Sequence, residues 1–566
     1  MRMVRTIVVA AFLATALAGA AAAQQADLVV LDGKVFTADG KSSIAQAFAV
    51  KDGHFLAVGS SRAMRRHIGA GTKVLDLHGR FVTPGLADGH FHNEGGGPGI
   101  DLSQARSLSD LFATVKAAAA KAKPGDVIVS NADWHEAQLK EKRLPLAAEL
   151  DAAAPDNPVV LIRGGHEMIL NGVALEKWNI TRETVSPDGG GIGKGADGAP
   201  DGELFDNARN LVTLPPPPPV TLDEVLRTQR TLNAYGITAV RIPGAYKGDL
   251  FADYKLLKEA RDKGELTLRY IVYLPGFGTR DPANIRDMIE NSGLKQDEGD
   301  DWLRIGGMKL LVDGGFEGGH MSAPYAEPYG KGGKFSGVTV VPTENYIAVV
   351  REVHRLGWRV ATHAVGDAAV AEVLDGYEAA NADRPIAGER WTIEHAFIVN
   401  PELLARMKKL GIIVSAQDHL YLAAPALKKY WGMKRASEVS PLKTFLDDGF
   451  LVAGGTDSPV VPFNPFWELY HFLTRDTISD GVYGADQRVT SRPTLLRLVT
   501  INYARMIGED KIKGSIEPGK LADFAVLSDD FLTVPAKRIL AMKALATYVG
   551  GKEVYADKRF SAAASP

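Results

Sequence analysis

Two kinds of hydrophobic pattern divide the chain, and the first of them occurs at both ends. Short apolar runs broken by Gly and Asp turns occupy residues 27–39, 47–59 and 73–85. Runs of four to eight residues between such turns are typical of β-strands. The same kind of pattern returns at 513–530 and 544–556. We therefore expect the two ends to pair into one small β-sandwich domain.

The second pattern fills the middle of the chain. In each of the segments 221–245, 344–367 and 401–418, apolar residues at helical spacing are followed by a Gly and a short apolar run. Repetition of this unit over about 400 residues indicates a parallel sheet covered by helices. Each apolar run ends in polar residues, as the strands of barrel enzymes do at their active face. The predicted fold class is α/β, a (β/α)8 TIM-type barrel with the β-sandwich beside it.

These patterns set the expected domain boundaries. The N-terminal part of the β-sandwich is predicted at 24–83, the barrel at 84–510 and the C-terminal part of the sandwich at 511–566. Two segments interrupt the barrel pattern. Residues 214–220 form a polyproline connector, and the Gly-rich segment 186–207 lacks the arrangement of a phosphate loop. A mobile loop over a pocket and a plain surface insertion stay open for 186–207.

The first 23 residues resemble a secretory signal peptide. Arg2 and Arg5 precede an Ala-rich apolar stretch, which ends in small residues with Ala21 and Ala23 at the spacing of a cleavage site. Cleavage is expected after about Ala23. An uncleaved membrane anchor is the alternative, but the apolar stretch is short for a spanning helix. We expect a periplasmic or secreted protein with no membrane association after cleavage.

Composition narrows the chemistry and the partners. A formal net charge of −3 gives no electrostatic reason to expect nucleic acid as a partner. The chain has no Cys, which excludes disulfides and thiolate metal ligands. Any metal must therefore be held by His, Asp, Glu or a modified Lys. A small molecule is the expected partner, and assembly into a homo-oligomer stays open.

Groups able to bind a metal stand where apolar runs end. His90 and His92, in the sequence DGHFH, are two positions apart and would face the same side of a strand. A barrel gathers the C-terminal ends of its strands at one mouth, so residues far apart in sequence can form one site. Four more such groups lie where later apolar runs end: Lys309, His363, His395 and Asp457.

The ordered set HxH, Lys, His, His, Asp resembles the amidohydrolase superfamily. More narrowly, VTPGLADGHFH, KLLVDGG, THAVGDAAV, IEHAF, GTDSPV and GSIEPGKLADFAVL are similar to the YtcJ-like, amidohydrolase-3 branch, which includes N-substituted formamide deformylases. Each motif alone is moderately specific, whereas six in the family's order are strongly specific. The resemblance covers nearly all of the mature chain and implies a metal-bearing (β/α)8 barrel with a small β domain.

The resemblance also implies a ligand set. Zn²⁺ is the expected metal, because neutral imidazole suits it. Lys309 is implied to be carbamylated and to bridge two metals, since an ammonium with a pKa of about 10.4 cannot donate to a metal. The alternative is an unmodified Lys309 paired with Asp313 or another acid. The implied sites are one metal on His90, His92 and Asp457 and a second on His363 and His395.

The implied reaction is hydrolysis of a carbon–nitrogen bond in an amide or N-acyl compound. Two metals sharing a water would lower its pKa from about 15.7 to about 7 and supply hydroxide. Asp457 is expected to act as general base and to pass the proton to the leaving nitrogen. His166, in RGGHEMILNG, resembles a family segment near the pocket and is a candidate to bind the substrate carbonyl or an acidic group.

Further residues are weaker candidates. Asp88, Glu394 and Asp367 neighbour ligand histidines and could fix their orientation, although turn or capping roles explain them equally well. The Gly-rich NEGGGPG after HxH and Glu317 with His320 in DGGFEGGHMSAPY depart from the family pattern. Pocket lining and ordinary packing are both open for Trp134, His135, His320 and Tyr421.

Two other functions compete with the binuclear hydrolase. A mononuclear deaminase or cyclic-amide hydrolase on the same barrel would use one metal and an unmodified Lys309. A periplasmic binding protein that had lost catalysis would show a damaged ligand set. Asp457 and four His are all present, which argues against the binding protein.

Overall fold

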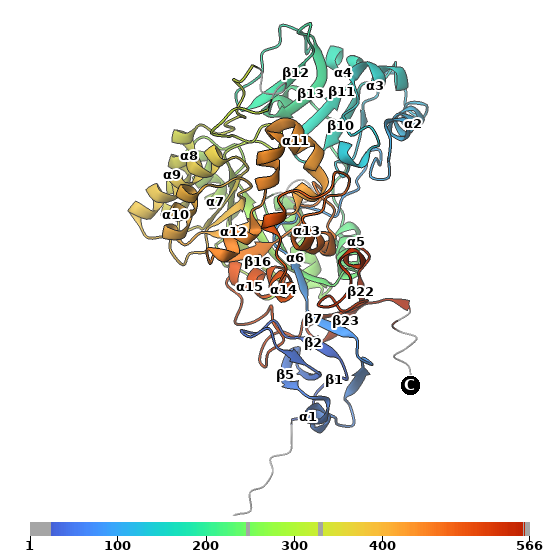
Figure 1. Cartoon of the computed structure of the whole chain (residues 1–566), viewed down its shortest axis with the longest axis vertical. Helices are drawn as coiled ribbons and strands as arrows, with labels where there is room; N and C mark the ends of the chain where they lie inside the picture. Colours follow the sequence, from blue (N-terminus) through green and yellow to red (C-terminus); the bar gives the residue numbers. More distant parts are fainter. Residues whose placement is uncertain (1–23, 245–249, 327–331, 559, 561–566) are drawn as a thin grey trace, which may run out of the picture.

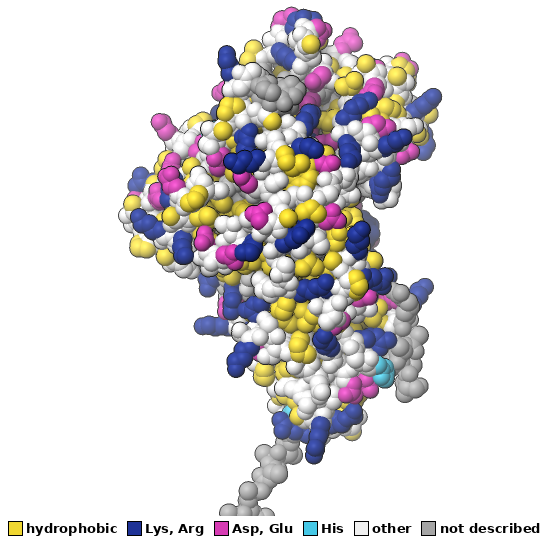
Figure 2. All heavy atoms as spheres, viewed as in Figure 1, with side chains coloured by type: hydrophobic (Ala, Val, Ile, Leu, Met, Phe, Trp, Pro, Cys, Tyr) yellow, Lys and Arg dark blue, Asp and Glu magenta, His cyan; other side chains and the backbone are white. Residues whose placement is uncertain are grey.

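The computed structural model describes residues 24–244, 250–326, 332–558 and 560. The predicted signal peptide, 1–23, lies outside this range. Within the described part, no helix combines the length and the apolar character needed to cross a membrane. On the face drawn in Figure 2, basic and acidic side chains are interspersed over most of the surface.

The centre of the molecule is a sheet of eight parallel strands (Figure 1). The edge strands β8 and β20 meet through the Gly89 N–H, which donates to Gly454 O at 2.9 Å, and through a parallel bridge between Phe91 and Ser458. These contacts close the sheet, and the predicted α/β barrel is confirmed. In order, the strands are β8 (Leu86–Asp88), β14 (Ile237–Pro243), β15 (Arg269–Pro275), β16 (Leu303–Leu311), β17 (Val360–Ala364), β18 (Thr392–His395), β19 (Ile413–Ala416) and β20 (Val452–Gly454).

Helices cover the outside of the barrel, and local sequence sets their ends. Thr221 caps α5 and forms a reciprocal capping box with Glu224. Asn400 caps α10 at its start, and Gly411 ends it in the left-handed conformation that Gly adopts without strain. The covering helices include α5 (Leu222–Asn233), α6 (Leu250–Asp262), α7 (Pro282–Ser292), α8 (Thr343–Arg355), α9 (Asp367–Asp383) and α10 (Pro401–Leu410).

The two chain ends share one β unit, drawn at the bottom of Figure 1. Strand β7 (Phe81–Pro84) pairs with β2 (Lys34–Phe36) on one side and with β21 (Phe524–Leu527) on the other. A second sheet has the strand order β5 (His54–Gly59), β4 (Ala47–Lys51), β1 (Leu28–Leu31) and β6 (Lys73–Asp76). Phe48 and Phe524 meet edge-to-face with centroids 4.9 Å apart, so residues from both ends pack in one core. The small β domain built from both chain ends, which the family resemblance implies, is thus present.

A third unit, drawn at the top of Figure 1, was not expected. It lies between β8 and β14 and has five strands in the order β12-β13-β11-β10-β9. The Gly-rich segment 186–207, expected to be a loop or plain insertion, forms a hairpin of β12 (Gly190–Lys194) and β13 (Pro200–Asp206). The glycines obscure the alternating pattern of a strand in the sequence, and close packing requires them. A Cβ at Gly191 would lie 2.0 Å from the Phe205 ring.

Strands β9 (Ile128–Val129), β10 (Val159–Arg163) and β11 (Glu167–Leu170) complete this insertion sheet. Helices α2 (Leu108–Ala119), α3 (Ala147–Ala153) and α4 (Gly172–Lys177) belong to the same unit. The exposed polyproline segment then leads back to α5 and the barrel.

Candidate metal centre

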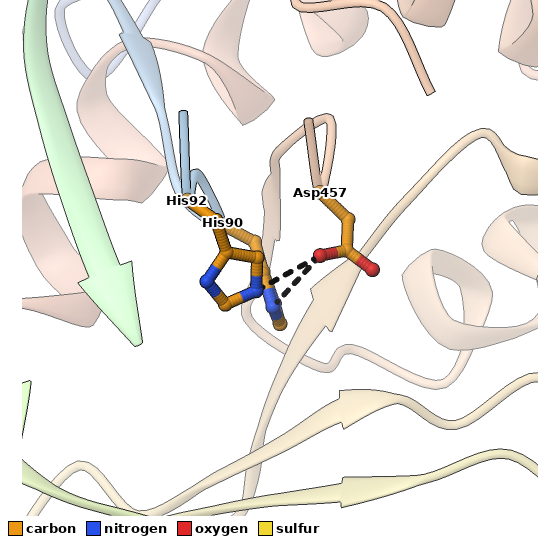
Figure 3. A group of neighbouring side chains, drawn as sticks. All are labelled: His90, His92 and Asp457. Carbon is orange, nitrogen blue, oxygen red and sulfur yellow. Dashed lines mark ion pairs between the residues drawn. The ribbon is translucent and has the colours of Figure 1, made fainter. Parts of the chain in front are cut away.

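His90 and His92, expected on a strand, lie just beyond the end of β8 and converge on Asp457 (Figure 3). His90 and His92 follow β8 and Asp457 follows β20, the two strands that close the barrel. Nε2 of His90 lies 3.4 Å and Nε2 of His92 lies 3.1 Å from the same oxygen, Oδ1 of Asp457. One ligand atom of each lies within 4.8 Å of the others. Three ligands on one point, two of them imidazole, form a suitable site for Zn²⁺.

Backbone conformation holds two of the predicted ligands in unusual positions. Asp457 has φ +58° and His395 has φ +74°, a region that residues other than Gly rarely adopt. The Asp457 N–H donates to the His90 carbonyl at 2.6 Å, so the two ligand loops are tied together. Strained backbone at a strand end is typical of sites where side-chain direction matters more than local stability.

A second group of side chains with the spacing of a metal site includes a residue that sequence analysis missed. His395, His419 and Asp457 also have ligand atoms within 4.8 Å of one another. His419 is the first residue of α11 (His419–Glu438), and its Nε2 lies 3.0 Å from Oδ2 of Asp457. Nδ1 of His395 lies 2.8 Å from Oε1 of Gln417, which leaves Nε2 as its ligand atom.

His363 stands beside this second group. Its ring centroid lies 4.6 Å from that of His395. Its Nε2 lies 3.1 Å from the Gly314 carbonyl, and since a carbonyl oxygen only accepts, Nε2 carries the proton and Nδ1 is the atom able to bind a metal. The structure therefore brings the predicted His363 and His395 together.

Lys309 reaches the same centre from β16. Its Nζ lies 3.5 Å from Nε2 of His90, and the side chain is buried. Among the described residues, no Asp or Glu oxygen lies within 4.0 Å of this nitrogen, so the alternative ion pair with Asp313 is not formed. Asp313 instead accepts backbone N–H groups of His320 and Gly366. Burial lowers the pKa of Lys309 to about 8.

Buried groups behind the ligands fix their orientation. Glu394 accepts from Nδ1 of His90 at 2.7 Å and forms a fully buried ion pair with Arg241 at 2.8 Å. Asp88 accepts the His90 N–H at 3.0 Å and the Thr456 hydroxyl at 2.6 Å. Both acids thus support His90, one through its ring and one through its backbone.

Asp367, the third acid weighed for such a role, lies elsewhere. It accepts the Ser322 N–H at 2.8 Å at the start of α9. This is an ordinary contact at a helix N-terminus, where an acid is favoured by the helix dipole.

The electrostatic environment of this centre keeps its buried histidines neutral and its carboxylate ionised. Burial lowers the pKa of His90 to about 4 and also depresses the pKa values of His363 and His395. These imidazoles are therefore neutral at pH 7, the form that binds a metal. Burial alone would raise the pKa of Asp457, but His90 and His419 outweigh it and keep the carboxylate ionised. Neutral imidazoles, one carboxylate and a buried Lys together fit a divalent metal.

A small cavity lies beside His363, His395 and Asp457, and the insertion forms its other side. His166 lines the cavity, stacks on His363 with centroids 5.3 Å apart, and places Nδ1 2.7 Å from Oδ1 of Asp206. Asp206 comes from the hairpin and packs into the DGGFEGG loop: a Cβ at Gly314 would lie 1.9 Å from its Oδ2. The close approach of this carboxylate explains why that loop is rich in Gly.

Glu317 and His320, which depart from the family pattern, have different surroundings. Glu317 lines the cavity and pairs with Arg163, whose Nη2 lies 2.5 Å from Oε1. His320 pairs with Glu372 at 2.9 Å, away from the ligand atoms.

Of the four residues weighed as pocket lining, Trp134 lines a second, larger cavity. His135 caps a short 3₁₀ turn at Glu136–Gln138, and the Tyr421 ring packs on Trp467 with centroids 5.5 Å apart. Packing therefore accounts for His135 and Tyr421.

Comparisons with known proteins agree with this geometry. Residues 73–555 match the amidohydrolase family. The chain is 33% identical over 552 residues to Protein LONG AFTER FAR-RED 3 of Arabidopsis thaliana, covering 94% of this chain and 92% of that protein. It is 27% identical to the putative amidohydrolase YtcJ of Bacillus subtilis (92% and 98% covered) and 28% identical to an N-substituted formamide deformylase of Arthrobacter pascens (93% and 98% covered).

A solved structure shows the same fold. An uncharacterized metal-dependent hydrolase of Pyrococcus furiosus superposes with a TM-score of 0.63 at 26% identity, covering 89% of this chain and all of that one. The resemblance to the YtcJ-like, amidohydrolase-3 branch is confirmed. The chain belongs to the amidohydrolase family, as a metal-dependent hydrolase of carbon–nitrogen bonds.

Proposed function

We propose that this protein is an exported hydrolase of an amide or N-acyl compound that works with two Zn²⁺ ions bridged by carbamylated Lys309. The observation that carries the proposal is the position of Lys309. Its nitrogen is buried 3.5 Å from a histidine of the HxH pair, with no described carboxylate in ion-pair range. Lys309 is a buried amine among the candidate ligands, with no described acidic group in ion-pair range. Conversion of this amine into an anionic carbamate would explain its position.

Carbamylation needs the neutral amine. Its lone pair attacks CO₂, an N–C bond forms, and one proton leaves the nitrogen to give a carbamate with two oxygen donors. With a pKa of about 8, about 10% of Lys309 is neutral at pH 7, against less than about 0.1% for an ordinary Lys. The low pKa therefore favours the modification, and the new negative charge would be balanced by the metals.

The protein's own residues would carry the proton. When bound, the metals supply a lowered water pKa and a polarised carbonyl. Asp457 takes the proton of the attacking water and delivers it to the leaving nitrogen. His419 contacts the second oxygen of that carboxylate at 3.0 Å and orients it. His166, held by Asp206, faces the cavity and binds the substrate carbonyl.

The size of the cavity supports a small acyl group. The space lined by His166, Glu317 and three of the predicted ligands, His363, His395 and Asp457, is about 30 Å³. A cavity needs about 10–15 Å³ of this measure to hold one water. A formyl or acetyl group fits such a space, and one relative is an N-substituted formamide deformylase. We assign the substrate as an N-substituted amide of a small carboxylic acid.

Location and partners follow from the sequence. The segment 1–23, with its basic residues, apolar stretch and A-x-A ending, supports export to the periplasm or medium. The partner is a small-molecule amide, and neither nucleic acid nor membrane is expected after cleavage.

A panel of N-substituted formamides and acetamides, incubated with zinc-loaded protein, tests the function. Amine and carboxylate should appear in equal amounts with wild type and fall at least about 100-fold with Asp457→Asn, because removal of a general base costs this much. If the fully metal-loaded wild type releases neither product from any member, the proposed reaction is wrong.

A further inference from the structure

The cavity beside the ligands has no room for the larger part of a substrate. Its volume of about 30 Å³ accommodates about two water-sized groups. Specific recognition of a small molecule normally uses a cavity of about 300–1,000 Å³. The remainder of the substrate must therefore bind in a neighbouring space.

Such a space adjoins the site. A cavity of about 560 Å³, here called the distal chamber, lies among the loop after His92, the loop after Asp457 and the segments 103–106 and 133–138 of the insertion. Its loops are tied to the metal centre, since Ser458 O accepts the His92 N–H at 3.0 Å. The chamber walls are mostly apolar and aromatic, and include Trp134, Tyr235, Leu422, Val460, Phe463 and Trp467.

Several polar groups in the chamber walls form hydrogen bonds within the protein, whereas the buried atoms Asp133 Oδ1, Ser458 Oγ and Ser479 Oγ form none with the described residues. The indole N–H of Trp134 donates to Ile162 O at 2.7 Å, and that of Trp467 donates to Leu540 O at 3.3 Å. Asp133 accepts the Gly96 N–H at 2.9 Å. The two indole N–H groups are thus satisfied, and the ring faces and aliphatic surfaces of the walls favour an apolar or aromatic group.

Val460 stands between the two cavities. It lines both the small cavity and the distal chamber. Its N–H donates to Asp457 O at 2.9 Å, so its position is linked to that of the catalytic loop. A Cβ built on Gly164 would lie 3.5 Å from the Val460 side chain, which shows how closely the insertion approaches at this point.

We propose that the distal chamber binds the N-substituent of the substrate, a bulky apolar or aromatic group, and that Val460 controls its access. The inference rests on the proposed amide hydrolysis. It follows because the small cavity at the ligands takes the acyl part, so the larger part of the molecule lies on the nitrogen side. The substrates would be amides that join a small acid to a large apolar amine.

The test compares N-methylformamide with N-(2-naphthylmethyl)formamide. Wild type should show a kcat/KM about 100-fold higher for the naphthyl compound, since full burial of a large aromatic group favours binding by about this factor. Val460→Trp should lower this preference at least tenfold. Val185→Trp is the matched control, because Val185 is 83% exposed, and it should keep the wild-type preference. An equal preference in wild type and Val460→Trp would overturn the proposal.

A binding measurement separates this proposal from the proposed reaction. Calorimetric titration of the zinc-loaded protein with 2-naphthylmethylamine needs no turnover. We expect binding that weakens at least tenfold in Val460→Trp and in Trp467→Ala, and that is retained in Val185→Trp. If neither amide is hydrolysed while this binding pattern holds, the reaction is wrong and the chamber assignment stands. Absence of binding to wild type, or equal binding to all variants, would overturn the chamber.

Discussion

Nδ1 of His90 lies 2.7 Å from Oε2 of Glu394, and this buried contact decides which nitrogen of His90 faces the metal site. Burial opposes ionisation of Glu394, yet the Arg241 guanidinium and His90 outweigh it and hold the pKa of this carboxyl well below its ordinary value. An ionised carboxylate only accepts, so Nδ1 carries the proton and Nε2 presents its lone pair to Asp457 and Lys309. A barrel strand several hundred residues away thus sets the tautomer of the first ligand.

Replacing Glu394 by Gln should weaken metal binding by about 10- to 100-fold, the usual cost of losing a partner behind a ligand. Arg241 would also lose its buried counter-charge, which should lower the melting temperature. Competition with a chromophoric zinc chelator measures the affinity. Glu402→Gln, at an exposed position on α10, is the control. Unchanged zinc affinity in a folded Glu394→Gln protein would show that the carboxylate does not orient His90.

His419 should affect turnover more than metal binding. Because its Nε2 contacts the oxygen of Asp457 that the HxH pair does not touch, we expect His419→Gln to lower kcat by about 10²- to 10⁴-fold. Metal content should remain that of wild type. Elemental mass spectrometry together with kinetics on one hydrolysed amide decides this, with exposed His54→Gln as the control. Loss of one metal equivalent would instead make His419 a ligand.

Carbamylation of Lys309 should depend on pH with a definite sign. Burial lowers the pKa of the amine to about 8, so the neutral fraction rises about tenfold per pH unit up to that value and then levels off. The rate at which metal-free protein recovers activity with zinc and bicarbonate should follow this curve, after correction for the dissolved CO₂ at each pH. A recovery rate that is flat between pH 6 and 8 would contradict a reacting Lys309 amine.

Asp418 gives a separate prediction about stability. Burial, with the nearby Asp88, raises the pKa of the Asp418 carboxyl to about 8, and burial raises that of Asp88 to about 6. The folded protein therefore holds a proton on Asp418 that the unfolded chain loses near pH 4. Above about pH 4 this group costs stability progressively, until it ionises in the folded state near pH 8. Asp418→Asn should therefore gain in melting temperature relative to wild type as pH rises from 5 to 8. A constant difference across that range would contradict a protonated Asp418.

The barrel and most of its ligands could be predicted because their signals are local. HxH lies just after the strand β8, and Lys309, His363 and His395 each lie at or near the end of a short apolar run that the structure shows as β16, β17 and β18. Parallel barrel geometry then brings these ends together without any further information from the sequence. The β domain from both ends was visible for a similar reason, since its strands alternate with Gly and Asp turns.

The insertion sheet and the residues it contributes could not be predicted in this way. In the hairpin that carries Asp206, close packing requires Gly where a strand pattern would show side chains, as at Gly191 against Phe205. His419 was missed because it begins a helix and does not end a strand. The pairing of Glu317 with Arg163 joins a barrel loop to the insertion, a contact that no local pattern encodes.

The most direct test of the central claim is the metal content of the purified mature protein. Wild type and Lys309→Ala would be produced with added zinc and measured by elemental mass spectrometry, with circular dichroism to confirm folding. We expect close to two zinc ions per wild-type chain, and one or none in the variant. A single metal that is unaffected by the substitution would contradict a bridging Lys309 and favour a mononuclear enzyme on the same barrel.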